Sequence, residues 1–219
     1  MIRHLSSLEK MLMVAVAFTM TLLVVRIAYT KELTYIFYIW NTFLAVLPLV
    51  FSHVLLRRNK YNGGALLLLT GWLAFFPNAA YLITDIFHYT EKPPVPKWFD
   101  LLLVTTGAWN GLLLGIVSLM QVEQFLLGHM QRKRVNRLII LSFILCGYGV
   151  YIGRYLRFNT WDTVTNPQTL LQTIASHVFL PHEHLSVWAF TISFGAMFGI
   201  VYYTLKQFKA KTISLKIVN

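Results

Sequence analysis

The sequence contains a single cysteine, Cys146, and few charged residues. One thiol cannot form an intramolecular disulfide, and it cannot build the multi-cysteine sites that hold structural zinc. Charged residues make up 12% of the 219 residues, whereas 57% are hydrophobic and the mean hydropathy is +0.60. A typical soluble domain carries about 25% charged residues. The shortage of charge therefore indicates that lipid surrounds most of the chain.

Several well-known sequence motifs are also absent. The chain has no P-loop, no G-x-G-x-x-G, no G-x-S-x-G and no H-E-x-x-H, which leaves the enzyme classes that carry them unsupported. Acidic residues are scarce too, with 8 against 19 basic residues and a net charge of +11. The basic residues are scattered over short segments that flank apolar runs, so anionic lipid headgroups are the expected counterions and nucleic acid is not an expected partner.

Long apolar runs dominate what is present. A membrane-spanning helix needs about 20 mainly apolar residues, and the sequence predicts an all-α, polytopic membrane helix bundle that forms one domain over residues 1–219. We expect six spans, at residues 11–29, 35–56, 64–83, 99–120, 138–155 and 186–205.

The distribution of basic residues predicts the orientation. Most of the 19 lie in the N-terminal segment, "RRNK" (57–60), "RKRVNR" (132–137) and the tail from Lys206. Cytoplasmic loops keep the excess of Lys and Arg. We therefore expect a multi-pass protein of the bacterial cytoplasmic (inner) membrane with both termini in the cytoplasm.

The connection between the fifth and sixth spans predicts a short additional helix. Asn166 is a candidate N-cap and Pro167 stands at the favoured first position. Apolar residues then recur at helical spacing as far as Phe179. We expect an amphipathic helix at 166–179 on the outer membrane surface, either as a connector or as a lid.

The stretch "FFPNAAYLITD" (75–85) places polar groups inside the third span. Pro77 removes a backbone donor and would kink the helix unless a neighbour compensates. If the helix continues to His88, then Asn78, Tyr81, Asp85 and His88 form one polar stripe at spacings of three and four.

Neighbouring spans bring more polar groups to the same expected level. Asp100 begins the fourth span and Asn110 lies further along it, while Arg154 and Arg157 end the fifth span shortly before Asp162. Such groups are costly in lipid and generally face a bundle interior or a wet cavity.

Three interpretations of this polar set stay open. The arginines can simply snorkel and pair with Asp85, Asp100 and Asp162. They can instead grip a phosphate or carboxylate, with Asp85 and Asp100 orienting or catalysing. In the third interpretation, Asp85 and His88 join Asp100, with His182 or His184 as a further ligand, to hold zinc or another divalent ion. We expect no cofactor, with a divalent metal as the alternative.

Three segments carry a resemblance: "FFPNAAYLITDIFH" (75–88), "WFDLLLVTTGAWNGLLLGIVSL" (98–119) and "GRYLRFNTWD" (153–162). In this order and spacing they resemble the bacterial integral membrane protein family catalogued as domain of unknown function 1361. The chain departs from the family pattern at Ala80 and Phe158, where a proline and a tryptophan are common. The resemblance implies a polytopic membrane protein and supplies no reaction. The positions that it marks as signature residues are Asn78, Asp85, Asp100, Arg154, Arg157, Asn159, Trp161 and Asp162.

The combined expectation is an extracytoplasmic-facing polar pocket that binds or acts on an anionic envelope molecule such as a lipid phosphate. Asp85 and Asp100 are the candidate catalytic residues. The alternatives are a transporter or permease component and a non-catalytic assembly or sensory factor. The candidate ligand-binding residues are Asn78, Tyr81, His88, Asn110, Arg154, Arg157, Asn159, Trp161 and Asp162.

Overall fold

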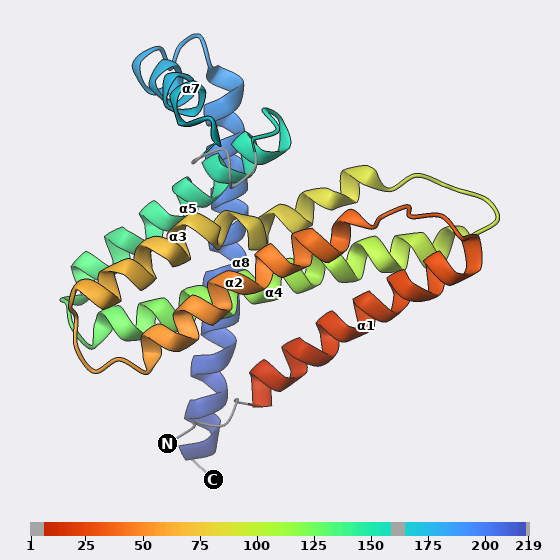
Figure 1. The fold of residues 1–219 in the computed structure, drawn as a ribbon. Coiled ribbons are helices and arrows are strands. Elements are labelled where there is room, and N and C mark those ends of the chain that lie inside the picture. The colour runs from red at the N-terminus through yellow and green to blue at the C-terminus, as the bar shows by residue number, and fades with distance from the viewer. Residues whose placement is uncertain (1–6, 159–164, 218–219) are drawn as a thin grey trace. The chain divides into compact units, whose positions relative to one another are not determined.

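The computed structural model describes residues 7–158 and 165–217, with side chains described as far as Phe208. Every regular element in these two ranges is helical, which confirms the predicted all-α class. Figure 1 shows the path of the chain. The elements are α1 (Ser7–Thr30), α2 (Phe37–Leu56), α3 (Gly63–Thr84), the 3-10 helix η1 (Asp85–His88), α4 (Lys97–Leu127), α5 (Arg132–Arg154), α7 (Pro167–Phe179) and α8 (Leu185–Ile217).

Six of the described helices are long and apolar enough to cross a membrane: α1, α2, α3 with η1, α4, α5 and α8 as far as Phe208. Each overlaps one predicted span, although α2 begins two residues later than predicted and α5 ends one residue earlier. Large apolar side chains such as Leu67 and Phe87 are exposed, whereas Arg26, Asp85 and Asp100 are buried. This reversal of the pattern of soluble proteins is what lipid favours, because lipid solvates apolar side chains and leaves ionisable ones to the bundle interior. The protein is a multi-pass membrane protein.

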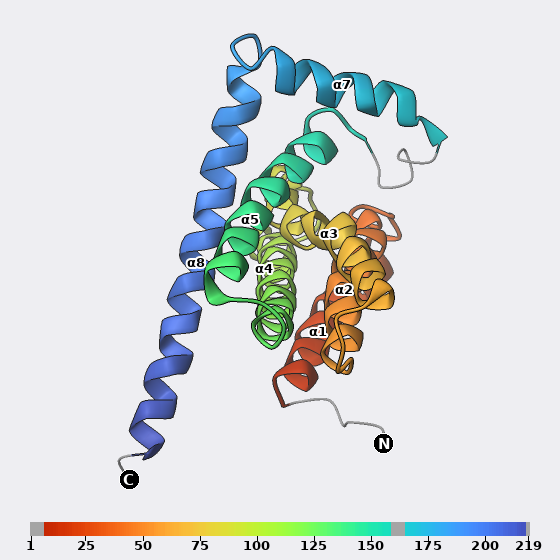
Figure 2. The same cartoon turned by 90° about the vertical axis from the view of Figure 1, so that its left-hand side faces the viewer.

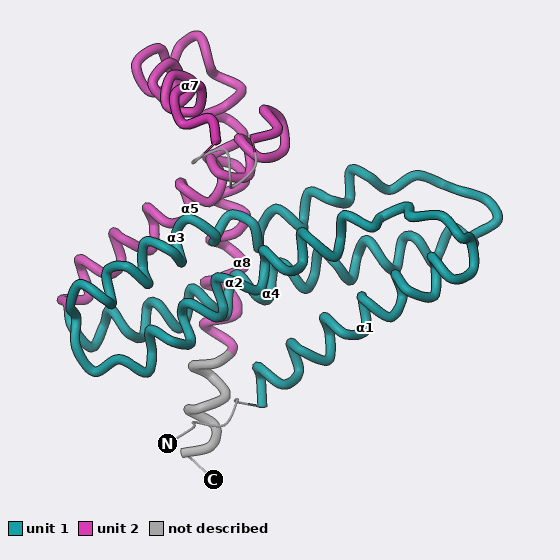
Figure 3. The backbone as a smooth tube through the Cα atoms, viewed as in Figure 1, with its two compact units in different colours: residues 1–129 teal, residues 130–219 magenta. Residues whose placement is uncertain are grey.

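The chain divides into two compact units, residues 1–129 and residues 130–219, which Figure 3 colours separately. Unit 1 contains α1 to α4, and successive helices run in opposite directions across the view of Figure 1. In it α2 packs against α3 and α4, α3 against α4, and α1 against α4. Among the described spans α4 is the most buried, which makes it the central helix of this unit.

Glycines on α4 permit this close packing. A Cβ atom on Gly107 would collide with the ring of Tyr38 on α2, and one on Gly111 would collide with the backbone oxygen of Ala79 on α3. Gly107 and Gly111 thus lie on intramolecular packing faces of α4, where small residues let helices approach closely in lipid.

Unit 2 contains α5, α7 and α8. The antiparallel helices α5 and α8 pack along each other. Figure 2 shows that α7, which precedes α8 in the chain, lies at the N-terminal end of α8. A Cβ on Gly195 of α8 would lie 2.7 Å from the backbone oxygen of Phe143 on α5. The predicted helix at 166–179 is confirmed as α7, which begins with Pro167.

Candidate functional site

The end of α3 sets the position of the first candidate residue. Pro77 lies inside α3 without ending it, and the side-chain amide of Asn78 donates to the carbonyl of Phe75 (3.2 Å). After Thr84 the chain tightens into η1, which turns about 120° per residue rather than about 100°. Because residues three apart lie on the same face of a 3-10 helix, η1 keeps Asp85 and His88 aligned, with Asp85 buried and His88 exposed. Asn78 and Tyr81 are half-buried.

Asp85 is fully buried, with 0% of its surface exposed. The side-chain nitrogen of Asn41 on α2 donates to its Oδ2 (3.0 Å). The carboxyl group of η1 is therefore tied to α2 by a neutral amide.

Asp100 begins α4 and forms an ion pair with Arg26 of α1. Arg26 Nε donates to Oδ1 (2.7 Å) and Nη2 donates to Oδ2 (3.2 Å), which is the two-pronged geometry that favours arginine over lysine. Both residues are buried, at 1% and 2% exposure. The described partner of Asp100 is thus Arg26, an arginine of the first span.

Tyr35 connects this ion pair to η1. Its ring lies 5.0 Å from the guanidinium carbon of Arg26, and its hydroxyl donates to the backbone oxygen of His88 (3.4 Å). Burial raises the pKa of the Tyr35 hydroxyl, so it stays a hydrogen-bond donor at ordinary pH. The residue has a φ of 65°, a left-handed conformation that costs a non-glycine residue energy. In this conformation the ring of Tyr35 lies over the guanidinium of Arg26.

We call Arg26, Tyr35, Asn41, Asp85 and Asp100 the acidic-end cluster. It contains two buried carboxyl groups and one buried guanidinium. The third nitrogen of that guanidinium, Nη1, is buried and has no hydrogen-bond partner among the described residues. Buried polar groups are nearly always satisfied, so Nη1 calls for an acceptor that the described residues do not supply.

Asn110, a predicted ligand-binding residue, contacts α1. Its amide nitrogen donates to the carbonyl of Ala15 (3.0 Å) and to the hydroxyl of Thr19 (2.9 Å), both on α1. Asn110 therefore ties α1 to α4 in the middle of the span.

Arg154 and Arg157 belong to unit 2. Arg154 lies in the last turn of α5 and is half-buried, while Arg157 is exposed and has a φ of 59°. Their expected meeting with the aspartates stays a prediction. Asn159, Trp161 and Asp162 lie outside the described residues.

The described residues contain no group of three or more His, Cys, Asp or Glu side chains placed to hold a metal ion. Asp85 and His88 lie in unit 1, whereas His182 and His184 lie in unit 2.

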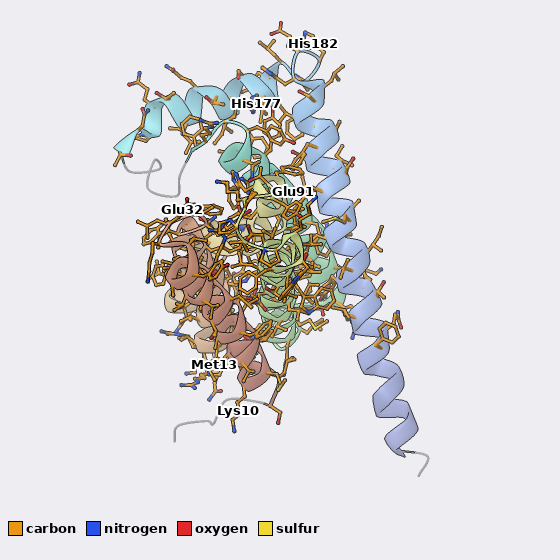
Figure 4. The ribbon with its side chains drawn as sticks, turned by 90° about the vertical axis from the view of Figure 1, so that its right-hand side faces the viewer. Lys10, Met13, Glu32, Glu91, His177 and His182 are labelled. Atoms are coloured by element: carbon orange, nitrogen blue, oxygen red, sulfur yellow. The ribbon has the colours of Figure 1, made fainter. Side chains whose placement is uncertain are left out.

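Unit 2 contains a polar and aromatic contact set of its own, which ties α7 to α5 and α8. The hydroxyl of Tyr148 on α5 lies 3.0 Å from Nδ1 of His177 on α7. The indole of Trp188 on α8 stacks on Tyr148 and donates to the His177 carbonyl (3.1 Å). Burial, together with the neighbouring His184, lowers the pKa of His177. Figure 4 labels His177 on α7 and His182 in the turn that follows.

Sequence reasoning did not single out Arg26, Tyr35 and Asn41. A signal existed for Arg26, because an arginine near the end of a predicted span has to find a partner or reach the interface. No comparable signal marked Tyr35 or Asn41, whose importance depends on which helices are neighbours.

A family model described as "Protein of unknown function (DUF1361)" matches residues 40–201. The chain belongs to this family. The matched range contains Asn41, Asp85 and Asp100 but not Arg26. No curated protein matches the chain, and no solved structure matches it.

Proposed function

We propose that the acidic-end cluster of this DUF1361 protein binds or acts on an anionic envelope molecule, such as a lipid phosphate. The observation that carries the proposal is the buried guanidinium of Arg26. Asp100 and Tyr35 hold it in place while Nη1 remains without a partner among the described residues. A rigid, desolvated N–H donor is well suited to an anionic oxygen.

The two carboxyl groups take different roles. Asp100 is engaged by both prongs of Arg26, so it positions the guanidinium. Asp85 has a neutral amide as its described side-chain donor, and it is the candidate acid, base or ligand. Arg154 and Arg157 are the candidates for additional anion contacts.

The proposal places this cluster outside the cytoplasm, with both termini in the cytoplasm. Figure 4 shows Lys10 at the opposite end of unit 1 from Glu32 and Glu91. A maleimide that cannot cross membranes tests this orientation. The native Cys146 is buried, so its background labelling should be low. Lys92→Cys should react in intact cells, and Lys60→Cys should react only after the cells are opened.

The test of function is mass spectrometry of the lipids that co-purify with the protein. Asp85→Asn preserves shape, and an Arg154→Gln, Arg157→Gln double variant removes the charges of the α5 end. We expect both to lose an anionic lipid that the wild-type protein retains. Arg26→Lys, which keeps the charge and loses the fork, should also lose it. Identical lipid profiles for folded variants and wild type would contradict the proposal.

A second candidate function is transport coupled to protons. Polar contacts join α1 to α4 at three depths, through Arg26 and Asp100, through Thr19 and Asn110, and through Glu9 and Gln121. Intramembrane ionisable residues of this kind often mark proton routes. Proteoliposomes with an internal pH dye test this candidate, because Asp85→Asn should abolish any proton movement that the wild type supports.

A further inference from the structure

Polar side chains also converge at the opposite end of unit 1, where the basic "RRNK" segment follows α2. Glu9 comes from the first turn of α1, Ser52, His53 and Arg57 come from the end of α2, and Gln121 comes from the last turns of α4. We call these five residues the basic-end cluster.

The contacts of this cluster determine which atoms carry the protons. His53 Nε2 lies 2.7 Å from Nη2 of Arg57, and arginine can only donate. Nε2 is therefore the acceptor, and Nδ1 carries the proton that it donates to Glu9 Oε1 (2.6 Å). With Arg57 in this position, His53 is neutral.

Further contacts hold the carboxylate in place. The Gln121 amide nitrogen donates to the same Glu9 oxygen (3.0 Å), and the Ser52 hydroxyl donates to the Gln121 oxygen (2.7 Å). Glu9 and Ser52 are buried, His53 is partly exposed and Arg57 is exposed. The buried anion is thus connected through a partly exposed imidazole to an exposed guanidinium.

We propose that the basic-end cluster is a binding site for a phosphate group and that binding is coupled to the uptake of one proton by His53. Neutral His53 presents a lone pair at Nε2, which would repel a phosphate oxygen. When Nε2 takes a proton from solvent, it becomes a donor and can no longer accept from Arg57. The phosphate oxygen then lies between the two groups and accepts from both, while Glu9 balances the imidazolium.

Chemical reasons favour a phosphate over a metal ion at this site. The guanidinium next to Nε2 repels a cation, and the described residues provide no cluster of three metal ligands. A guanidinium beside a histidine matches the several oxygens of a tetrahedral anion.

The position of the cluster makes two sources of the phosphate relevant. His53 lies in the last turn of a membrane-spanning helix and Arg57 is its C-cap, which is the depth of a lipid headgroup. A soluble phosphate ester or inorganic phosphate has the same recognisable chemistry. Competition between the lipid and inorganic phosphate separates these two sources.

In the described part of the chain, the charged groups that contact His53 are Glu9 of α1 and Arg57 at the end of α2. The third helix, α4, contributes the neutral Gln121, which donates to Glu9.

The test is native mass spectrometry of the purified full-length protein with phosphatidylglycerol, compared with phosphatidylcholine. Phosphatidylglycerol keeps its charge between about pH 5.5 and about pH 8, so any pH dependence comes from the protein. We expect the affinity for phosphatidylglycerol to rise about tenfold as the pH falls across this range.

Three variants examine the individual residues. Arg57→Gln should weaken binding about tenfold at low pH. Arg58→Gln is the matched control, because Arg58 is its exposed neighbour in the same basic run and has no described contact with His53; it should bind like the wild type. His53→Gln should retain weak binding and lose the pH dependence. Thermal unfolding of each variant checks that it folds.

Added inorganic phosphate distinguishes the sources. Competition by inorganic phosphate assigns the site to the phosphate group itself, and binding of the lipid without competition assigns it to a whole lipid; both support the proposal. The proposal fails if Arg58→Gln weakens binding as much as Arg57→Gln. It also fails if the pH dependence survives in His53→Gln or is absent from the wild type.

Discussion

In unit 1 the first helix is attached through buried polar side chains, whereas in unit 2 the helices approach at glycines and aromatic rings. The contacts of α1 with α4 include an ion pair, an amide bonded to a hydroxyl and a carbonyl, and a second amide bonded to a carboxylate. The contacts of α5 with α8 include Gly195 against the Phe143 backbone and the stacked rings of Tyr148 and Trp188.

The difference matters because lipid offers helices no hydrophobic reason to associate. Small residues allow two helices to approach closely over a long surface, but they do not prevent one helix from sliding along the other. Hydrogen bonds at separate depths determine one register. Unit 1 therefore gains a defined position for Arg26 and Asp100, which a functional site needs, while unit 2 gains close contact.

The largest expected effect is on the ion pair of unit 1. Asp100→Asn leaves Arg26 buried without its counter-charge, so we expect a loss of about 3 to 5 kcal/mol in the free energy of unfolding. Reversible unfolding in mixed micelles measures it.

A double variant completes this test. Arg26→Met with Asp100→Leu removes both charges and should unfold at nearly the wild-type free energy. If Asp100→Asn proved as stable as the wild type, the pair would not control the stability of unit 1.

The next effect concerns close packing in unit 2. Gly195→Ala places a methyl group 2.7 Å from a backbone oxygen of α5, which cannot turn aside as a side chain could. We expect a loss of about 1 to 3 kcal/mol, measured in the same micelles. Gly63→Ala is the control, because a Cβ at Gly63 meets nothing within 4 Å. An equal loss at both glycines would mean that packing against α5 is not the cause.

A smaller effect should follow from Asn110→Leu. This change removes the two hydrogen bonds to α1 while keeping the volume, and hydrogen bonds within membrane bundles contribute about 1 kcal/mol or less each. Thr21→Val is the control, since that exposed hydroxyl bonds only within its own helix. Cross-linking between cysteines placed on α1 and α4 would reveal whether the register also loosens. An unchanged register would show that the other two polar contacts suffice.

The sequence predicted the spans well because length and hydropathy are local properties. It also predicted the start of α7, because Asn166 and Pro167 signal a helix N-terminus by themselves. The ion pair could not be predicted, because Arg26 and Asp100 are 74 residues apart and hydropathy does not determine which helices are neighbours. The stripe along α3 and η1 stays a prediction, although the helical spacing of three between Asp85 and His88 is kept.

The smallest expected effect is a local one in unit 2, at the contact between α7 and the two long helices. The pKa of His177 is lowered in the folded protein, so the folded state favours the neutral imidazole. The contribution of this contact is fully present above the ordinary histidine pKa of about 6.5 and is lost as the pH falls through the lowered value. Acid should therefore release α7 before unit 2 unfolds, because a charged His177 would face His184 at a ring distance of 4.5 Å.

Hydrogen exchange of the α7 amides, followed from neutral to acidic pH, should show protection falling in the wild type and staying constant in His177→Gln. His182→Gln, at an exposed histidine beside the same helix, should behave like the wild type. If α7 lost protection equally in His177→Gln, the release would come from another group, and the contact of His177 with Tyr148 would be only a packing contact.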